Sequence, residues 1–341
     1  MRYPIMKRAL IALIIPLLFI AGCGADNRKF NGDFVNPLPP AGAFDIDAGN
    51  ALGVTAVTYD ALLQSGELAG LAGSIDDSLG GGLTKGSFNR QVGGVLNAVV
   101  QAADPLEPIV GECFNEGGTV TFTFDIIDPL ILLGGMFSVG DTVLIEYLNC
   151  DEGFGEIVDG TIDGTIDAFA GDIFSGNGYA MTMAMNLTDF QVDIGSDVFT
   201  SNGDATAALD TRVSLYVSAS VGGSLMTTDR NNSSEILTDY SSAQTLDLNL
   251  DPTEYTATAL GTLDSTQIDG LVDYSTPVGF LAFDLNNPHL GQLLVTAETG
   301  SARLIAQENA IDVVIEVYST SDGTGEPVET INTTWAELAA M

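Results

Sequence analysis

Apolar and polar positions alternate most regularly in residues 155–194. Every second residue is apolar in residues 161–168 and again in residues 179–188, and Gly and Asn mark a turn at residues 175–178. Side chains of a β-strand point alternately to its two faces. The pattern therefore predicts a β-hairpin with one apolar face and one polar face.

Shorter runs of the same kind fill the chain from Cys113 onward, and Gly, Asn, Asp and Pro separate them. They predict about ten strands in residues 119–263 and about four or five more in residues 270–338. Because no helix-length pattern lies between these strands, an antiparallel meander is favoured over parallel pairing. So many strands must curl, close or split into layers. We expect a mainly β (α+β) fold, a large curved antiparallel meander sheet or incomplete barrel with N-terminal helices packed on it.

Helical patterns precede the strands. Apolar residues at mixed three- and four-residue spacings favour a helix in residues 50–79, and a clearer apolar stripe predicts a second helix in residues 87–103. Such a stripe must be buried, and the concave face of the sheet is its expected partner. We therefore expect residues 49–112 to form a helical cover segment, continuous with the antiparallel β domain of residues 113–341.

Residues 1–22 have a pattern typical of secretion. Basic residues occur in residues 1–8, and residues 9–20 form an apolar run that is too short to span a bilayer comfortably. A basic start followed by a short apolar run indicates a signal peptide.

The apolar run ends in Ile20-Ala21-Gly22-Cys23, which resembles the lipobox of bacterial lipoproteins. The resemblance implies cleavage before Cys23, attachment of a diacylglyceryl group to its thiol, acylation with a chain such as palmitate, and export. Gly24 follows Cys23, which in the enteric sorting pattern implies the outer membrane. Residues 23–48, which include a Pro-rich stretch, are expected to form a lipidated tether. The alternative for Cys23 is a buried Cys in an ordinary secretory signal.

The end of the chain carries a second resemblance. Three segments are similar to the C-terminal part of uncharacterised lipoproteins from proteobacteria: His289-Leu290-Gly291-Gln292-Leu293-Leu294-Val295-Thr296, Ala302-Arg303-Leu304 and Thr334-Trp335-Ala336-Glu337-Leu338. Those lipoproteins carry no known activity. The resemblance therefore implies only fold and location in the cell envelope.

Charge restricts the partners. The chain has 46 acidic and 10 basic residues, a net charge of −36, and removal of residues 1–22 would leave seven basic residues and a net charge of −39. Such a polyanion is repelled by nucleic acid and by anionic membrane surfaces, so we expect neither as a partner. The acidic residues either form a solvated surface or attract cations.

Two cysteines remain after lipidation of Cys23. In an oxidising exported compartment, Cys113 and Cys150 are expected to form one disulfide. A metal site is the alternative, but it would need further ligands, and His289 is the only His in the chain.

Calcium is the only cofactor that a motif suggests. The Asp-Gly repeat of the predicted hairpin contains Asp159 and Asp163, and a later turn contains Asp322 and Glu326. Neither has the ligand spacing of a calcium loop. The first pair fits the polar face of a strand and the second a plain hairpin turn, so all four residues are only weak calcium candidates.

The apolar face of the predicted hairpin is the other candidate site. Its members are candidate lining residues of an apolar cavity for a lipid or another apolar small molecule: Ile162, Ile166, Met181, Met183 and Met185. The alternative is ordinary core packing. Three thioethers could also bind copper, but core filling is the commoner role.

Enzymatic motifs are sparse. With one His, no free Cys and no Gly-x-Ser-x-Gly sequence, no catalytic residue is assigned. We expect a lipid-anchored envelope protein, a non-enzymatic binding or structural module that holds an apolar ligand, with unidentified protein partners. The alternatives are a carboxylate-based surface hydrolase and a calcium-stabilised adhesion protein.

Overall fold

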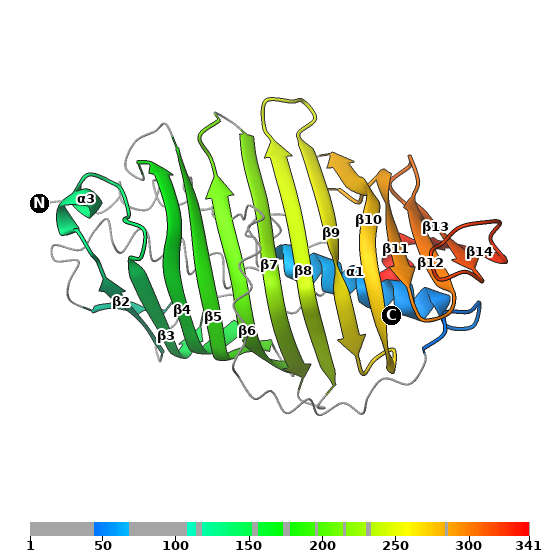
Figure 1. The fold of residues 1–341 in the computed structure, drawn as a ribbon, viewed down its shortest axis with the longest axis horizontal. Coiled ribbons are helices and arrows are strands. Elements are labelled where there is room, and N and C mark those ends of the chain that lie inside the picture. The colour runs from blue at the N-terminus through cyan, green and yellow to red at the C-terminus, as the bar shows by residue number, and fades with distance from the viewer. Residues whose placement is uncertain are drawn as a thin grey trace, which may run out of the picture.

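Antiparallel pairing of consecutive strands organises the molecule (Figure 1). The computed structural model describes residues 44–67, 108–113, 118–151, 156–172, 178–194, 197–213, 216–229, 233–283 and 286–340. In these residues, fourteen strands form one sheet whose spatial order is the order of the chain. They are β1 (Ile109–Glu112), β2 (Thr119–Asp125), β3 (Thr142–Asp151), β4 (Glu156–Gly171), β5 (Tyr179–Ile194), β6 (Asp197–Asp210), β7 (Tyr216–Asp229), β8 (Ser234–Asp247), β9 (Glu254–Ser265), β10 (Gly270–Phe283), β11 (Leu290–Thr296), β12 (Ser301–Ala306), β13 (Asp312–Tyr318) and β14 (Glu329–Thr334). The predicted mainly β fold and antiparallel meander are confirmed, and β1 and β14 are the two edges of an open sheet.

The predicted hairpin of residues 155–194 is β4 and β5, the two longest strands at 16 residues each. Ile162 lies opposite Leu187, and Ile166 lies opposite Met183. Opposite residues of antiparallel strands share a face. The alternation therefore gave the correct pairing and the correct apolar face.

One face of the sheet, which we call the inner face, carries the core. A single row of mutually opposite residues crosses nine strands from β2 to β10, and all of them are buried: Phe122, Ile145, Ile162, Leu187, Gly203, Leu225, Leu237, Leu263 and Val272. Burial of each large apolar side chain contributes at most about 1.5–3 kcal/mol, so the row is a major source of stability. The opposite face is called the outer face.

Helix α1 (Ala51–Glu67) lies on the inner face, across β7–β9 and β11–β13 (Figure 1). Tyr59 of α1 packs against Trp335 and Phe280, with ring centroids 4.9 and 5.6 Å apart. Trp335 begins the short helix α4 (Trp335–Leu338). The contact confirms an N-terminal helix packed on the sheet. The second predicted helix, residues 87–103, lies outside the described residues.

Two predicted boundaries differ from the structure. Ile46, assigned to the tether of residues 23–48, is buried, and its N–H donates to the carbonyl of Thr299 at 3.0 Å. Residues 109–112, assigned to the helical cover, form β1 and pair with β2. The β-branched pair Ile109-Val110 suits a strand, and the neighbouring edge of β2 supplies its hydrogen bonds.

The expected disulfide is present. Cys113 follows β1 and Cys150 lies on β3, with Cα atoms 5.3 Å apart and a sequence separation of 37. The bond ties the end of the edge strand to the strand beyond its neighbour. Of the helices in the described ranges, none is long and apolar enough to cross a membrane.

Replacing both Cys113 and Cys150 with Ala should lower the free energy of unfolding by about 3–4 kcal/mol, because the unfolded chain regains the entropy of the open loop. Urea unfolding of the two proteins measures the difference. Dithiothreitol should destabilise the wild type to a similar degree and leave the double variant unchanged. Equal urea midpoints for wild type and variant would contradict this role.

Candidate functional site

The five candidate cavity residues lie together on the inner face. Ile162 and Ile166 lie on β4, Met181, Met183 and Met185 lie on β5, and each is between 1% and 4% exposed. Met183 packs over Gly164, where a Cβ atom would lie only 2.8 Å from its sulfur. The strands that α1 contacts begin at β7, so α1 does not account for this burial. That these residues line a cavity stays a prediction.

The calcium candidates are not brought together. Asp159 accepts a hydrogen bond from the N–H of Asn149 at 2.8 Å, and Asp163 is exposed on the outer face. Asp322 accepts from the N–H and hydroxyl of Thr324, which lowers its pKa, and Glu326 is exposed. No group of three or more His, Cys, Asp or Glu side chains suited to a metal occurs among the described residues.

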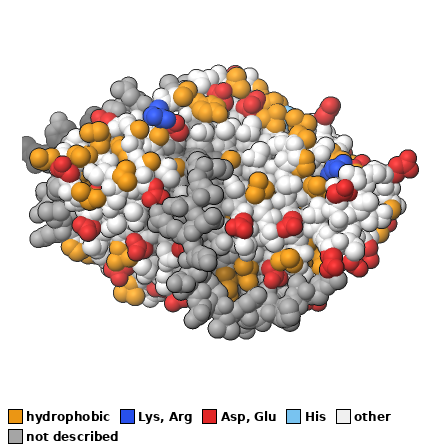
Figure 2. Space-filling model, in the orientation of Figure 1, with side chains coloured by type: hydrophobic (Ala, Val, Ile, Leu, Met, Phe, Trp, Pro, Cys, Tyr) orange, Lys and Arg blue, Asp and Glu red, His pale blue; other side chains and the backbone are white. Residues whose placement is uncertain are grey.

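Acidic side chains are dispersed over the outer face. Figure 2 shows Asp and Glu spread across the face turned away from α1, with very few Lys or Arg. Asp264 on β9 has a raised pKa because it is partly buried, and its opposite residues on β8 and β10 are Ile236 and Leu271. Apolar neighbours on a sheet surface, rather than a cleft with a second carboxylate, account for the shift.

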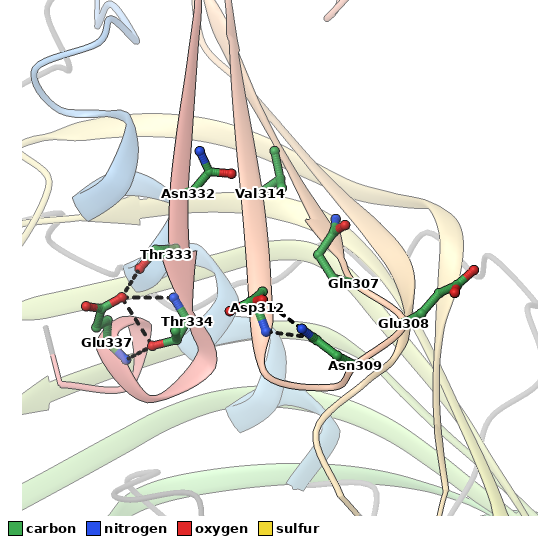
Figure 3. Close-up of a pocket in the computed structure, with 9 residues that line it drawn as sticks. All are labelled: Gln307, Glu308, Asn309, Asp312, Val314, Asn332, Thr333, Thr334 and Glu337. Atoms are coloured by element: carbon green, nitrogen blue, oxygen red, sulfur yellow. Dashed lines mark hydrogen bonds between the residues drawn. The ribbon is translucent and has the colours of Figure 1, made fainter.

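A polar groove of about 690 Å³ lies at the C-terminal end of the sheet (Figure 3). We call it the C-terminal groove, and its lining residues are Gln307, Glu308, Asn309, Asp312, Val314, Asn332, Thr333, Thr334 and Glu337. Asp312 accepts a hydrogen bond from the side-chain amide of Asn309 at 2.7 Å. A carboxylate-based hydrolase would need an acid and a base facing each other in a groove of this kind.

Glu337 is committed to a structural role in that groove. Its carboxylate accepts from the Thr333 hydroxyl and the Thr334 N–H, both at 3.0 Å, while the Thr334 hydroxyl accepts from the Glu337 N–H at 3.2 Å. This reciprocal pair is a capping box at the start of α4. The hydrogen bonds lower the pKa of Glu337, the opposite of what a general acid requires.

A different cluster was missed by the sequence analysis. Tyr240, Ser242 and Gln244 lie on the inner face of β8, a strand that α1 contacts. All three are at most 4% exposed. The Tyr240 and Ser242 hydroxyls and the Gln244 carbonyl oxygen have no hydrogen-bond partner in the structure. We call these three residues the polar line.

The strand neighbours of the polar line are mostly small and apolar, and the Tyr274 phenol lies near Tyr240. Tyr240 lies opposite Gly223, Ser242 lies between Val221 and Ala259, and Gln244 lies opposite Ala257. Burial raises the pKa of Tyr240 well above its usual range. An unpaired buried polar group costs about 1–3 kcal/mol, and more than about nine in ten such groups in native proteins are paired. Three on one face of one strand therefore point to a partner that is not a side chain of the described residues.

The sequence pattern of β8 does not reveal the polar line. Strict alternation would place Leu237 with Asp239 and Ser241, but Leu237 and Tyr240 share the inner face. A register irregularity between residues 238 and 241 shifts the alternation, and Asp239 has a positive φ of 49° there. Because polar residues then occupy both faces of β8, the apolar pattern cannot show which face is buried.

Thr334→Ala should lower the free energy of unfolding by about 1 kcal/mol, since it removes an N-cap. Fluorescence of Trp335, the only Trp, follows the urea transition. Because folding lowers the pKa of Glu337, this stabilisation is present above the ordinary Glu pKa and is lost as the pH falls through the lowered value. Thr330→Ala, at an exposed position of the same strand, is the control; equal effects of both substitutions would contradict the capping role.

Comparison of the chain with protein-family models, with curated proteins and with solved structures gives no match. Function is therefore inferred from the residues and contacts of this chain.

Proposed function

We propose that this chain is a lipid-anchored protein of the cell envelope and a non-enzymatic binding module that holds an amphiphile on the inner face of its sheet. The observation that carries the proposal is the polar line, three buried and unpartnered polar atoms on one strand of the inner face. Solvation of these atoms by a ligand would offset the cost of their burial.

Register rows connect the polar line to the methionine face. Met185 on β5 and Tyr240 on β8 belong to one row, in which only Ala205 and Gly223 lie between them. Three strand spacings separate the ends of the row, about 14 Å at about 4.8 Å each. The row therefore has a polar end at Tyr240 and an apolar end at Met185, with only small side chains between them. That length suits the extended acyl chain of a medium-length amphiphile.

The polar line also selects the polar end of the ligand. The hydroxyls of Tyr240 and Ser242 can donate, and the Gln244 carbonyl oxygen accepts. The two basic residues of the described chain lie elsewhere: Arg212 pairs with Asp210, and the Arg303 guanidinium lies over the Tyr318 ring. Because neither described cation lies beside it, the polar line favours a neutral alcohol, ester or amide over a carboxylate or phosphate.

Ligand content provides the first test. The protein purified from membranes in mild detergent should carry a neutral amphiphile detectable by native mass spectrometry, and Tyr240→Phe/Ser242→Ala should reduce its occupancy at least about tenfold, since each lost hydrogen bond contributes about 1 kcal/mol or more. After delipidation the variant should be at least as stable as the wild type, because it buries fewer unpaired hydroxyls.

Ser241→Ala is the matched control, because Ser241 is the neighbouring serine on the same strand and is less buried than Ser242. It should leave occupancy unchanged. Equal ligand content in all three proteins, or a delipidated double variant that has lost stability, would sink the binding proposal.

The anchor has its own test. Cys23→Ser should abolish incorporation of labelled palmitate and release the protein from the membrane fraction, because Cys23 supplies the acylated thiol. The Cys113→Ala/Cys150→Ala variant should keep its label. Palmitate incorporation into the Cys23→Ser protein would rule out lipidation at this position.

A further inference from the structure

The connection between β2 and β3, residues 126–141, exposes an unusual number of apolar side chains, and we call it the apolar loop. Ile127 is 64% exposed, Leu130 78%, Met136 41% and Val139 66%. Helix α3 (Pro129–Leu133) lies in its first half, at the β2 end of the sheet (Figure 1). Large apolar side chains gathered on one surface segment usually mark an interaction site.

The apolar loop is held in a defined shape. The buried carboxylate of Asp141 accepts from the N–H groups of Ile127 at 2.8 Å and Ser138 at 2.7 Å, which clamps the two halves of the loop together. Asp128 caps α3 by accepting from the N–H of Leu130 at 3.0 Å. The four exposed side chains are therefore presented by a braced loop.

Buried residues fix the apolar loop to the sheet. Ile126, Leu132 and Phe137 are all in the core, and Phe137 packs edge-on against Phe169 of β4 with ring centroids 5.6 Å apart. The loop thus divides its apolar residues into an inward set that anchors it and an outward set that has no such role. The outward set needs another explanation.

The charge of the apolar loop restricts the kind of surface that it can bind. Its only charged residues are Asp128 and Asp141, and both carboxylates accept hydrogen bonds from the loop's own backbone. No Lys or Arg is present to bind an anionic headgroup. Binding would have to be driven by burial of the loop's apolar side chains, which suits a neutral lipid surface.

We propose that the apolar loop inserts into the lipid surface to which the acylated Cys23 tethers the protein. The inference rests on the proposed lipid anchor. Anchoring through one residue brings the domain to the bilayer, and insertion of the loop would add a second point of attachment that fixes its orientation.

The length of the tether allows both attachments at once. The chain from Cys23 to Phe44 can extend over about 70 Å, at about 3.4 Å per residue. Its far end is docked at Ile46, whose N–H is bonded to Thr299 just before β12. The apolar loop follows β2, and ten strand spacings of about 4.8 Å between β2 and β12 amount to about 48 Å.

A single new thiol can report insertion. In the acylated full-length protein, Cys113 and Cys150 are paired and Cys23 carries lipid, so Leu130→Cys can be labelled with an environment-sensitive fluorophore. In phosphatidylcholine vesicles its emission should shift to the blue and be quenched by spin-labelled lipid. Val328→Cys, at a 63% exposed apolar position before β14, should show neither change.

Affinity gives an independent readout. With Cys23→Ser as background, binding to phosphatidylcholine vesicles should fall at least about tenfold on Leu130→Ser/Val139→Ser, because two large apolar side chains no longer enter the bilayer. Val328→Ser should leave binding unchanged. A water-exposed probe at position 130 in the acylated, vesicle-bound protein would overturn loop insertion while leaving the anchor intact.

The remaining outcomes separate the two proposals. Vesicle binding through the loop, together with no palmitate label at Cys23 of the wild type, would support insertion and refute the anchor. A blue shift at position 130 that depends on protein concentration and appears without vesicles would identify a second copy of the chain as the partner and overturn the proposal.

Discussion

Cross-strand register is the constraint on which the rest of the structure depends. Because side chains alternate between the two faces, a slip of one residue in any strand would move its buried set to solvent. The row through Ile145, Ile162 and Leu187 stays in register across nine strands, so the apolar content of each strand specifies its neighbours. With every strand paired to the next in sequence, the sheet can be long without crossover connections.

The middle of the inner face departs from that apolar rule in two ways. Ala205 and Gly223 are small where neighbouring strands carry large side chains, and Tyr240 and Ser242 bring hydroxyl groups into the core. Small residues alone would be explained by a closely packed helix, and α1 does lie over β7–β9. A helix does not explain hydroxyls without partners, because a packed core favours apolar side chains at such positions. The combination therefore favours a binding role over a purely structural one.

The sequence predicted what depends on local pattern and missed what depends on tertiary context. Period-two alternation identified the hairpin of β4 and β5, and cysteine number with compartment identified the Cys113–Cys150 disulfide. The inner face of β8 was missed because a register irregularity beside Asp239 interrupts its alternation. The exposure of Leu130 could not be predicted either, since an apolar run has the same sequence pattern whether it is buried or presented to a partner.

The apolar loop and the inner face are physically joined. The N–H of Gly140 donates to the carbonyl of Ile166, and the N–H of Ile166 donates to the carbonyl of Asp141, both at 2.8 Å. Ile166 lies opposite Met183, on the face proposed to hold the apolar part of a ligand. If the loop enters the bilayer and the inner face binds an amphiphile, the lipid surface and the binding face meet at Ile166. An apolar chain could then move between them with little exposure to water, which would lower the cost of transfer in either direction.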